Sequence, residues 1–168
     1  MYGLRSVVVT GMGAVTPLAC GVEASWEAVL EGKSAARLIT EFETDDLPAK
    51  VACMVPRGEG DSEYRPERAM NSKESRRYGD FIGYALCAAQ EALTQSGYEP
   101  KTDQARERVG VVFGSGIGGF NTICDHSLIL AERGPRRVGP FFVPSSLVNL
   151  PSGLIGIHHG FLGPNHAV

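Results

Sequence analysis

The glycine-rich segment "GSGIGG", residues 114–119, constrains the fold of this chain more than any other feature. It directly follows the apolar run "VGVVF", residues 109–113, which is typical of a strand inside an α/β sheet. Glycines 114, 116 and 119 match the spacing G-x-G-x-x-G, and a segment able to form a helix comes next. The sequence therefore predicts a strand, a tight glycine loop and a helix in this order.

Two general explanations for these glycines follow from the residues alone. A dinucleotide-binding unit also needs a second strand that ends in Asp or Glu about 20 residues later. The segment there, "GPRRVGPFF", is neither strand-like nor acidic, although Arg136 and Arg137 could meet the 2′-phosphate of NADP. The other explanation is close packing, because glycine allows a positive φ or a tight approach of a helix to a strand. An NADP-binding domain is thus the weaker of these two hypotheses.

Composition excludes several classes of protein. The 168 residues are 43% hydrophobic and 21% charged, which suits a globular domain. A net charge of -3 argues against nucleic acid as the main partner. No apolar stretch approaches the ~18 residues of a membrane span, so no membrane partner is expected. Because a strand is expected within a few residues of the N-terminus, we expect no targeting peptide, and therefore a cytoplasmic protein or a processed organelle form.

The four cysteines and four histidines form no recognisable metal motif. The cysteines lack C-x-x-C spacing and are expected to be reduced, mostly buried packing residues. The histidines are expected at surfaces or helix ends. These residues are Cys20, Cys53, Cys87, Cys124, His126, His158, His159 and His166. We therefore expect neither a metal nor a cofactor.

The hydrophobic pattern predicts further elements around the glycine loop. The expected strands are a buried central strand at 7–10, a possible strand at 50–55, the strand at 109–113 and the start of a strand at 166–168. The expected helices cover 22–30, 72–96, 121–133 and 147–157, and a surface excursion at about 33–70 lies between the first two. The first helix should bury Val22, Trp26, Val29 and Leu30 and stop at Gly32, and the last should kink or restart at Pro151. Residues 135–146 contain too many prolines for a strand or a helix. This order implies an α/β fold with helices on the faces of a sheet.

The long helix carries the clearest local signals. Asn71 and Glu74 resemble a capping box at its start, and Gly97 suits its end. Its apolar stripe is rich in alanine, as at Ala88 and Ala92, which allows a neighbouring element to approach closely. We expect this helix to be deeply buried.

Four sequence blocks together resemble a known family. They are "RSVVVTGMGAVTPLACGVEASWEAVLEGKS", "GVVFGSGIGGF", "GPRRVGPFFVPSSLVNL" and "LGPNHAV". In this order they are similar to the N-terminal half of β-ketoacyl-acyl carrier protein synthases, most of all the synthase II type of bacterial and mitochondrial fatty-acid synthesis. The resemblance spans residues 1–168 and implies half of a thiolase-like fold, a mixed sheet with helices on its faces. Pro151 departs from the family pattern, which puts the helix geometry near the dimer interface in doubt.

The resemblance implies a decarboxylating Claisen condensation of acyl and malonyl thioesters carried by acyl carrier protein. In the family the nucleophilic cysteine follows the "GPNHAV" strand by a few residues, and the catalytic histidines and lysine belong to the second half. None of the cysteines or histidines here matches a catalytic position. We therefore expect these 168 residues to be inactive alone and to partner acyl carrier protein, a second copy or the C-terminal half. The alternative is a non-catalytic module for carrier-protein binding or dimerisation.

The resemblance also assigns two sets of binding residues. Ile117 matches the gate of the acyl pocket, and Phe142 and Val143 match residues that line this pocket from across the dimer interface. The glycines would then leave space for an acyl chain. The competing interpretation for these three residues is plain core packing.

Five basic residues match positions that dock the acidic carrier protein. They are Lys73, Arg76, Arg77, Arg136 and Arg137. Clustered cations steer an acidic partner at long range, and salt weakens their effect. The competing interpretation is a solvated helix face.

Overall fold

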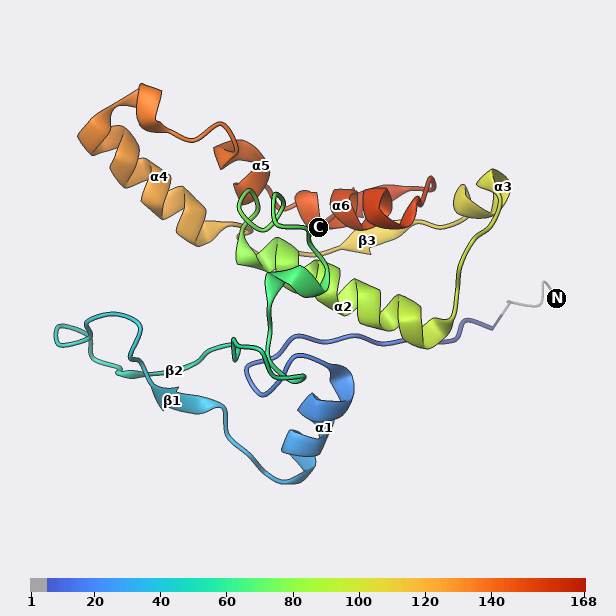
Figure 1. The fold of residues 1–168 in the computed structure, drawn as a ribbon, viewed down its shortest axis with the longest axis horizontal. Helices are drawn as coiled ribbons and strands as arrows, with labels where there is room; N and C mark the ends of the chain where they lie inside the picture. Colours follow the sequence, from blue (N-terminus) through green and yellow to red (C-terminus); the bar gives the residue numbers. More distant parts are fainter. Residues whose placement is uncertain (1–5) are drawn as a thin grey trace.

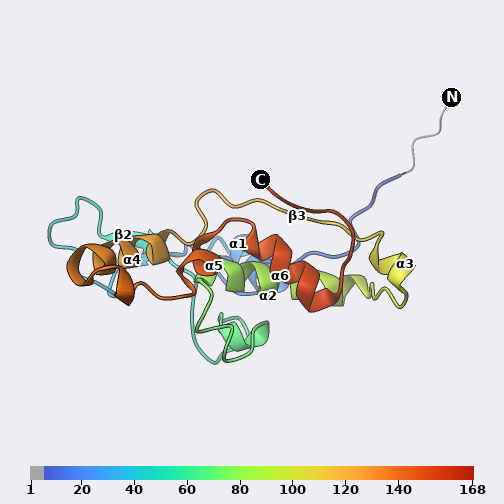
Figure 2. The ribbon, with the colours of Figure 1, turned by 90° about the horizontal axis from the view of Figure 1, so that it is seen from above.

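The computed structural model describes residues 6–168, in which helix α2 (Asp80–Ser96) forms the centre of an elongated α/β arrangement (Figures 1 and 2). Helix α6 (Leu150–His159) packs along α2. The core between them consists of five buried side chains: Met70, Ile82, Leu86, Leu154 and Ile155. The prediction of a deeply buried long helix is confirmed for the first half of α2, where residues 82–87 are mostly buried, whereas residues 88–96 are partly or fully exposed.

Strand β3 (Val111–Phe113) pairs in parallel with strand β4 (Asn165–Ala167), and both contact α6. Side chains alternate along a strand, so Val111 and Phe113 pack against the core while Val112 is exposed. The side-chain amide of Asn165 donates a hydrogen bond of 2.8 Å to the Ser152 carbonyl and ties β4 to α6. The strand predicted before the glycine loop and the strand predicted at 166–168 are both confirmed.

Helix α2 begins later than the sequence predicted. The Asn71–Glu74 capping box does form: the Asn71 N–H donates to Glu74 Oε2 at 2.9 Å, and the Glu74 N–H donates to Asn71 Oδ1 at 3.1 Å. However, it opens a separate turn over residues 71–78, because Gly79 has extended backbone angles and interrupts the helix. Gly97 ends α2 in the left-handed conformation, as expected.

The alanine stripe of α2 receives an extended chain segment. A Cβ atom on Gly13 would lie 1.8 Å from the Ala88 carbonyl oxygen, and one on Gly11 would lie 2.0 Å from the Ala92 carbonyl oxygen. Glycine and alanine together therefore allow residues 11–14 to run directly against α2. The close approach predicted from the stripe is confirmed, with an extended segment as the neighbour.

The prediction of a buried strand at 7–10 is wrong for the described structure. These residues belong to no strand, and the exposed fraction of Val7 is 96%. A strand needs a neighbour that accepts its backbone hydrogen bonds, and in residues 6–168 β3 pairs only with β4. The β-branched run has the right composition but lacks a partner edge.

Helix α1 (Val22–Leu30) forms where predicted, and Gly32 follows its C-cap Glu31 with a φ of +68°, as expected for a stop. Its predicted apolar face is wrong: Trp26, Val29 and Leu30 are exposed, whereas Ser25 and Ala28 are buried. The carboxylate of Glu91 on α2 fixes this orientation. It accepts hydrogen bonds from the Val22 N–H at 2.8 Å and from the Ala14 N–H at 2.9 Å.

The excursion at 33–70 contains more regular structure than predicted. Strands β1 (Ala36–Leu38) and β2 (Val51–Cys53) form an antiparallel pair, and β2 lies within the predicted strand. The strands of the described chain thus form two separate two-stranded sheets, whereas one mixed sheet was expected. Buried Tyr64 packs with Cys20 and Cys87 and anchors the excursion on α2.

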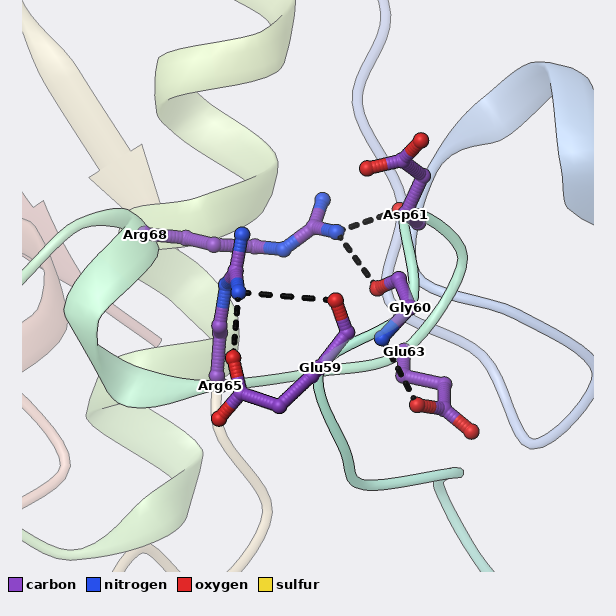
Figure 3. A network of polar contacts seen from close by, with 6 residues as sticks. All are labelled: Glu59, Gly60, Asp61, Glu63, Arg65 and Arg68. Carbon is purple, nitrogen blue, oxygen red and sulfur yellow. Dashed lines mark hydrogen bonds and ion pairs between the residues drawn. The ribbon is translucent and has the colours of Figure 1, made fainter.

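The 3₁₀ helix η1 (Pro66–Arg68) closes the excursion with a polar network (Figure 3). Arg65 pairs with Glu59 at 2.7 Å. Arg68 donates to the Gly60 carbonyl at 3.0 Å and to the Asp61 carbonyl, and the Gly60 N–H donates to Glu63 at 2.9 Å. The two arginines therefore hold the loop at 59–63 against η1.

Helix α3 (Asp103–Arg106) precedes β3, and helix α4 (Phe120–Arg133) follows the glycine loop as predicted. The prediction for 135–146 is wrong, because this segment forms a 3₁₀ helix, η2 (Pro135–Arg137), and helix α5 (Phe142–Ser146). Pro135 and Pro144 lie in first turns, where no intrahelical N–H bond is lost. Pro151 similarly lies in the first turn of α6, so the predicted restart is confirmed.

In residues 6–168 no helix combines the length and the apolar character needed to cross a bilayer. Cys20 and Cys87 are buried as predicted, whereas Cys53 and Cys124 are exposed because they lie on β2 and α4, which leave these side chains uncovered.

Candidate functional site

The glycine loop is pressed against the end of α5. The Gly119 N–H donates a hydrogen bond of 3.1 Å to the Ser146 carbonyl. A Cβ atom on Gly118 would lie 2.5 Å from the Ser146 carbonyl oxygen, and one on Gly119 would lie 2.3 Å from the Ser145 carbonyl oxygen. Gly118 also has a φ of +69°, which favours glycine. The backbone contact with α5 thus explains the last two glycines of the loop.

The predicted acyl-pocket residues lie around this contact. Ile117 is at the tip of the loop with an exposed fraction of 63%, and Val143 on α5 is also exposed. Phe142 is half-buried. Plain core packing is therefore excluded for Ile117 and Val143 within the described chain.

Three of the predicted basic residues, Lys73, Arg76 and Arg77, are exposed on the turn at 71–78. The turn is fixed at Glu74, whose carboxylate closes the capping box and contacts Nε2 of His158 on α6 at 2.9 Å. Burial raises the pKa of Glu74, but the hydrogen bonds from Asn71 and His158 outweigh it, so the pKa lies below its ordinary value. The basic side chains are thereby presented from a fixed backbone.

A cavity of about 270 Å³ brings the basic turn and α5 together. The guanidinium carbon of Arg77 lies 4.5 Å from the centre of the Phe141 ring. The lining also includes side chains from α4: the full lining is Arg76, Arg77, Tyr78, Gly79, Thr122, His126, Gly139, Pro140, Phe141, Phe142 and Ser145. Two predicted carrier-binding arginines thus share one cavity with a predicted acyl-pocket residue.

His126, like Phe141, lines this cavity and was not assigned to a site from the sequence. Its ring stacks on Phe142 with the ring centres 5.0 Å apart and the planes 29° apart. Its Nδ1 lies 3.0 Å from the Thr122 carbonyl oxygen. Helical spacing places His126 on α4 but gives no sign that α5 folds back across it, so no signal in the sequence identified this contact.

The other predicted site residues do not line this cavity. Lys73 lies on the same turn, but its side chain, like those of Ile117 and Val143, is not part of the lining. Arg136 and Arg137 are on η2, at the end of α4 that points away from the basic turn (Figure 1). The five cations therefore occupy two separate places on the surface.

The dinucleotide hypothesis is wrong for this structure. The segment that would have to supply a second strand with an acidic end forms η2 and α5. The last glycines of the loop contact the backbone of α5, which occupies the space beside them.

Comparison with known proteins shows which family the chain belongs to. The family model "Beta-ketoacyl synthase, N-terminal domain" matches residues 4–168. The chain belongs to the β-ketoacyl synthase family. The family resemblance inferred from the four sequence blocks is therefore confirmed.

The relatives are 3-oxoacyl-[acyl-carrier-protein] synthases, and the bacterial one is named synthase 2, the type that the sequence suggested. The chain is 48% identical over 166 residues to 3-oxoacyl-[acyl-carrier-protein] synthase 2 of Rhizobium meliloti, covering 98% of this chain and 39% of that protein. It is 41% identical over 177 residues to the mitochondrial 3-oxoacyl-[acyl-carrier-protein] synthase of Arabidopsis thaliana, covering 97% and 38%. The chain thus spans well under half the length of these relatives.

Solved structures confirm the predicted fold class. The ishigamide ketosynthase/chain length factor superposes with a TM-score of 0.81 at 26% identity, covering 99% of this chain and 40% of that one. A type II PKS ketosynthase in complex with its acyl-carrier protein superposes with a TM-score of 0.69 at 24% identity, covering 96% and 41%. The chain therefore has the fold of the corresponding part of these β-ketoacyl synthases.

The buried thiols are poorly suited to nucleophilic catalysis. Burial raises the pKa of Cys87 to about 11 and also raises the pKa of Cys20. A thiol with a raised pKa holds little thiolate near neutral pH. Among the described residues, no group of three or more His, Cys, Asp or Glu side chains could hold a metal ion.

Proposed function

We propose that residues 1–168 are the N-terminal part of a β-ketoacyl-acyl carrier protein synthase of fatty-acid synthesis. The whole protein joins an acyl group and a malonyl group, each delivered as a thioester on acyl carrier protein, and releases CO₂. This part of the chain contributes binding surfaces, and the nucleophilic cysteine belongs to the rest of the protein. The whole protein is a cytoplasmic homodimer.

One observation carries the assignment of the binding surfaces. Arg76 and Arg77 share a cavity with Phe142, so a cationic surface adjoins an aromatic wall. An acidic carrier protein that delivers an apolar acyl chain needs these two chemistries side by side. The proposal assigns Lys73, Arg76 and Arg77, together with Arg136 and Arg137 on η2, to carrier docking.

The apolar part of the proposed site comes from the glycine loop and α5. The loop presents Ile117, and α5 presents Phe142 and Val143. Ile117 acts as a movable gate, for which its exposed position at a glycine-flanked tip leaves room. Val143 contacts the second subunit of the dimer, which would cover its exposed side chain.

Charge reversal tests the docking assignment. The double variant Arg76→Glu and Arg77→Glu, made in the whole protein, should weaken affinity for acyl carrier protein by about tenfold or more, because like charges then face each other. Isothermal titration at low salt measures the affinity. The control is Arg108→Glu, which changes an exposed arginine beyond α3. An unchanged affinity for the double variant, or an equal loss in the control, would contradict the assignment.

A further inference from the structure

The side chain of Arg77 belongs to the surface assigned to carrier docking and also contacts Phe141, the residue that precedes α5. Its guanidinium carbon lies 4.5 Å from the centre of the Phe141 ring, and Phe142 is the next residue along the chain. We infer that Arg77 is a positioning residue that links carrier docking to the acyl pocket through Phe141. This inference rests on the proposed function and adds a route by which one binding event influences the other.

The first step of the route is the contact between Arg77 and Phe141. A guanidinium that stacks on a ring face keeps its N–H donors in its own plane, so it can bind a carboxylate while it remains stacked. A carboxylate of the carrier that binds Arg77 therefore also restrains the position of the ring. Lysine has no planar group and would keep the charge without this restraint.

The second step runs from Phe141 into α5. Phe141 caps the start of this helix, and its carbonyl accepts a hydrogen bond of 2.9 Å from the Ser145 N–H. The Phe142 N–H donates to the Gly139 carbonyl at 3.0 Å, and the Phe142 ring stacks on His126 of α4. Because the helix has only five residues, a shift at Phe141 reaches its whole length.

The third step reaches the glycine loop. The carbonyls of Ser145 and Ser146 at the end of α5 contact Gly118 and Gly119 so closely that a Cβ on either glycine would overlap them. Ile117 is the next residue toward the loop tip. A continuous series of contacts therefore runs from the Arg77 guanidinium through the two phenylalanine rings and α5 to the proposed gate, Ile117.

Because of thermodynamic linkage, the coupling can be measured either at the docking surface or at the acyl pocket. If docking changes the acyl pocket, then an acyl chain in the pocket must change the carrier affinity by the same factor. The acyl-enzyme is the suitable state, because its pocket is filled while its docking surface is free. Direct contacts between the acyl chain and the incoming carrier protein are then excluded from the comparison.

The experiment measures the affinity of the whole protein for carrier protein without an acyl chain, before and after loading with a long-chain acyl group. In the wild type the two affinities should differ by about fivefold or more. In Arg77→Lys and in Phe141→Leu the affinities of the loaded and unloaded protein should differ by less than about twofold, whatever the affinity of the unloaded variant. Arg76→Lys is the matched control and should keep the wild-type difference. Thermal unfolding confirms that all variants are folded.

The outcomes separate the two proposals. A wild type that neither binds carrier protein nor accepts an acyl group overturns the proposed function, and the coupling with it. A wild type that loads normally but shows equal affinities in both states overturns the coupling alone. An equal effect of Arg76→Lys and Arg77→Lys also overturns the role of the Arg77–Phe141 contact.

Discussion

The two sides of α2 differ in what covers them. On the side of α6, Ile82 and Leu86 are buried against Leu154 and Ile155. On the side of the N-terminal segment, Val7 and the α1 residue Leu30 remain exposed although their hydrophobic pattern is as regular. A hydrophobic pattern therefore identifies a face that is suited to burial, but the neighbour that buries it is a separate requirement.

Truncating a leucine on each side tests this comparison with the largest effect. Leu86→Ala should lower the free energy of unfolding by about 2–5 kcal/mol, because it leaves a cavity beside α6. Leu30→Ala should change it by less than about 0.5 kcal/mol, since 70% of this side chain is exposed, against 1% for Leu86. Urea unfolding measures both values. Similar losses in the two variants would show that α1 is covered as α2 is.

The glycines offer a second comparison. Gly13→Ala should destabilise by about 1–3 kcal/mol, because its Cβ would overlap the Ala88 carbonyl and push the N-terminal segment away from α2. Gly116→Ala is the matched change, since no atom lies within 4 Å of its added Cβ. It should be nearly neutral in thermal unfolding. A neutral Gly13→Ala variant would mean that residues 11–14 do not rest on α2.

The smallest effect is expected at the turn that joins the basic surface to the core. Glu74→Gln should cost about 1 kcal/mol near neutral pH, because it weakens the capping box and the contact with His158. The pKa of Glu74 is lowered in the folded state, so its stabilisation is present above the ordinary carboxyl pKa and is lost as the pH falls through the folded value.

The difference between wild type and Glu74→Gln should therefore shrink below about pH 4. Glu99→Gln, at an exposed carboxylate, is the control and should show a small difference at every pH. A difference at Glu74 that stays constant from neutral to acidic pH would contradict the paired carboxylate.

Sequence signals predicted the elements that depend on local chemistry. Gly97 and Gly32 ended their helices, Asn71 and Glu74 formed their capping box, and Pro151 opened α6. The strand at 7–10 was wrong because a strand depends on a distant partner, which local composition does not contain. The helices at 135–146 were missed because proline disfavours the interior of a helix but not its first turn.

The candidate site was only partly predictable for the same reason. The family resemblance assigned Arg77 and Phe142 separately, and the structure adds that they share one cavity. Phe141 and His126 were not assigned, because their contacts join the basic turn, α4 and α5, which lie far apart in the sequence. Contacts between such distant segments depend on how the chain folds back, and no local pattern records this.

The most direct test of the account places a large side chain at the tip of the glycine loop. Ile117→Trp, made in the whole protein, should reduce acyl transfer from carriers with long chains by about tenfold or more while transfer of short chains remains, because the indole fills the space required by a long chain. Leu128→Trp on α4 is the control, since its exposed fraction of 61% is close to the 63% of Ile117. An unchanged chain-length profile for Ile117→Trp would contradict the assignment of this loop to the acyl pocket.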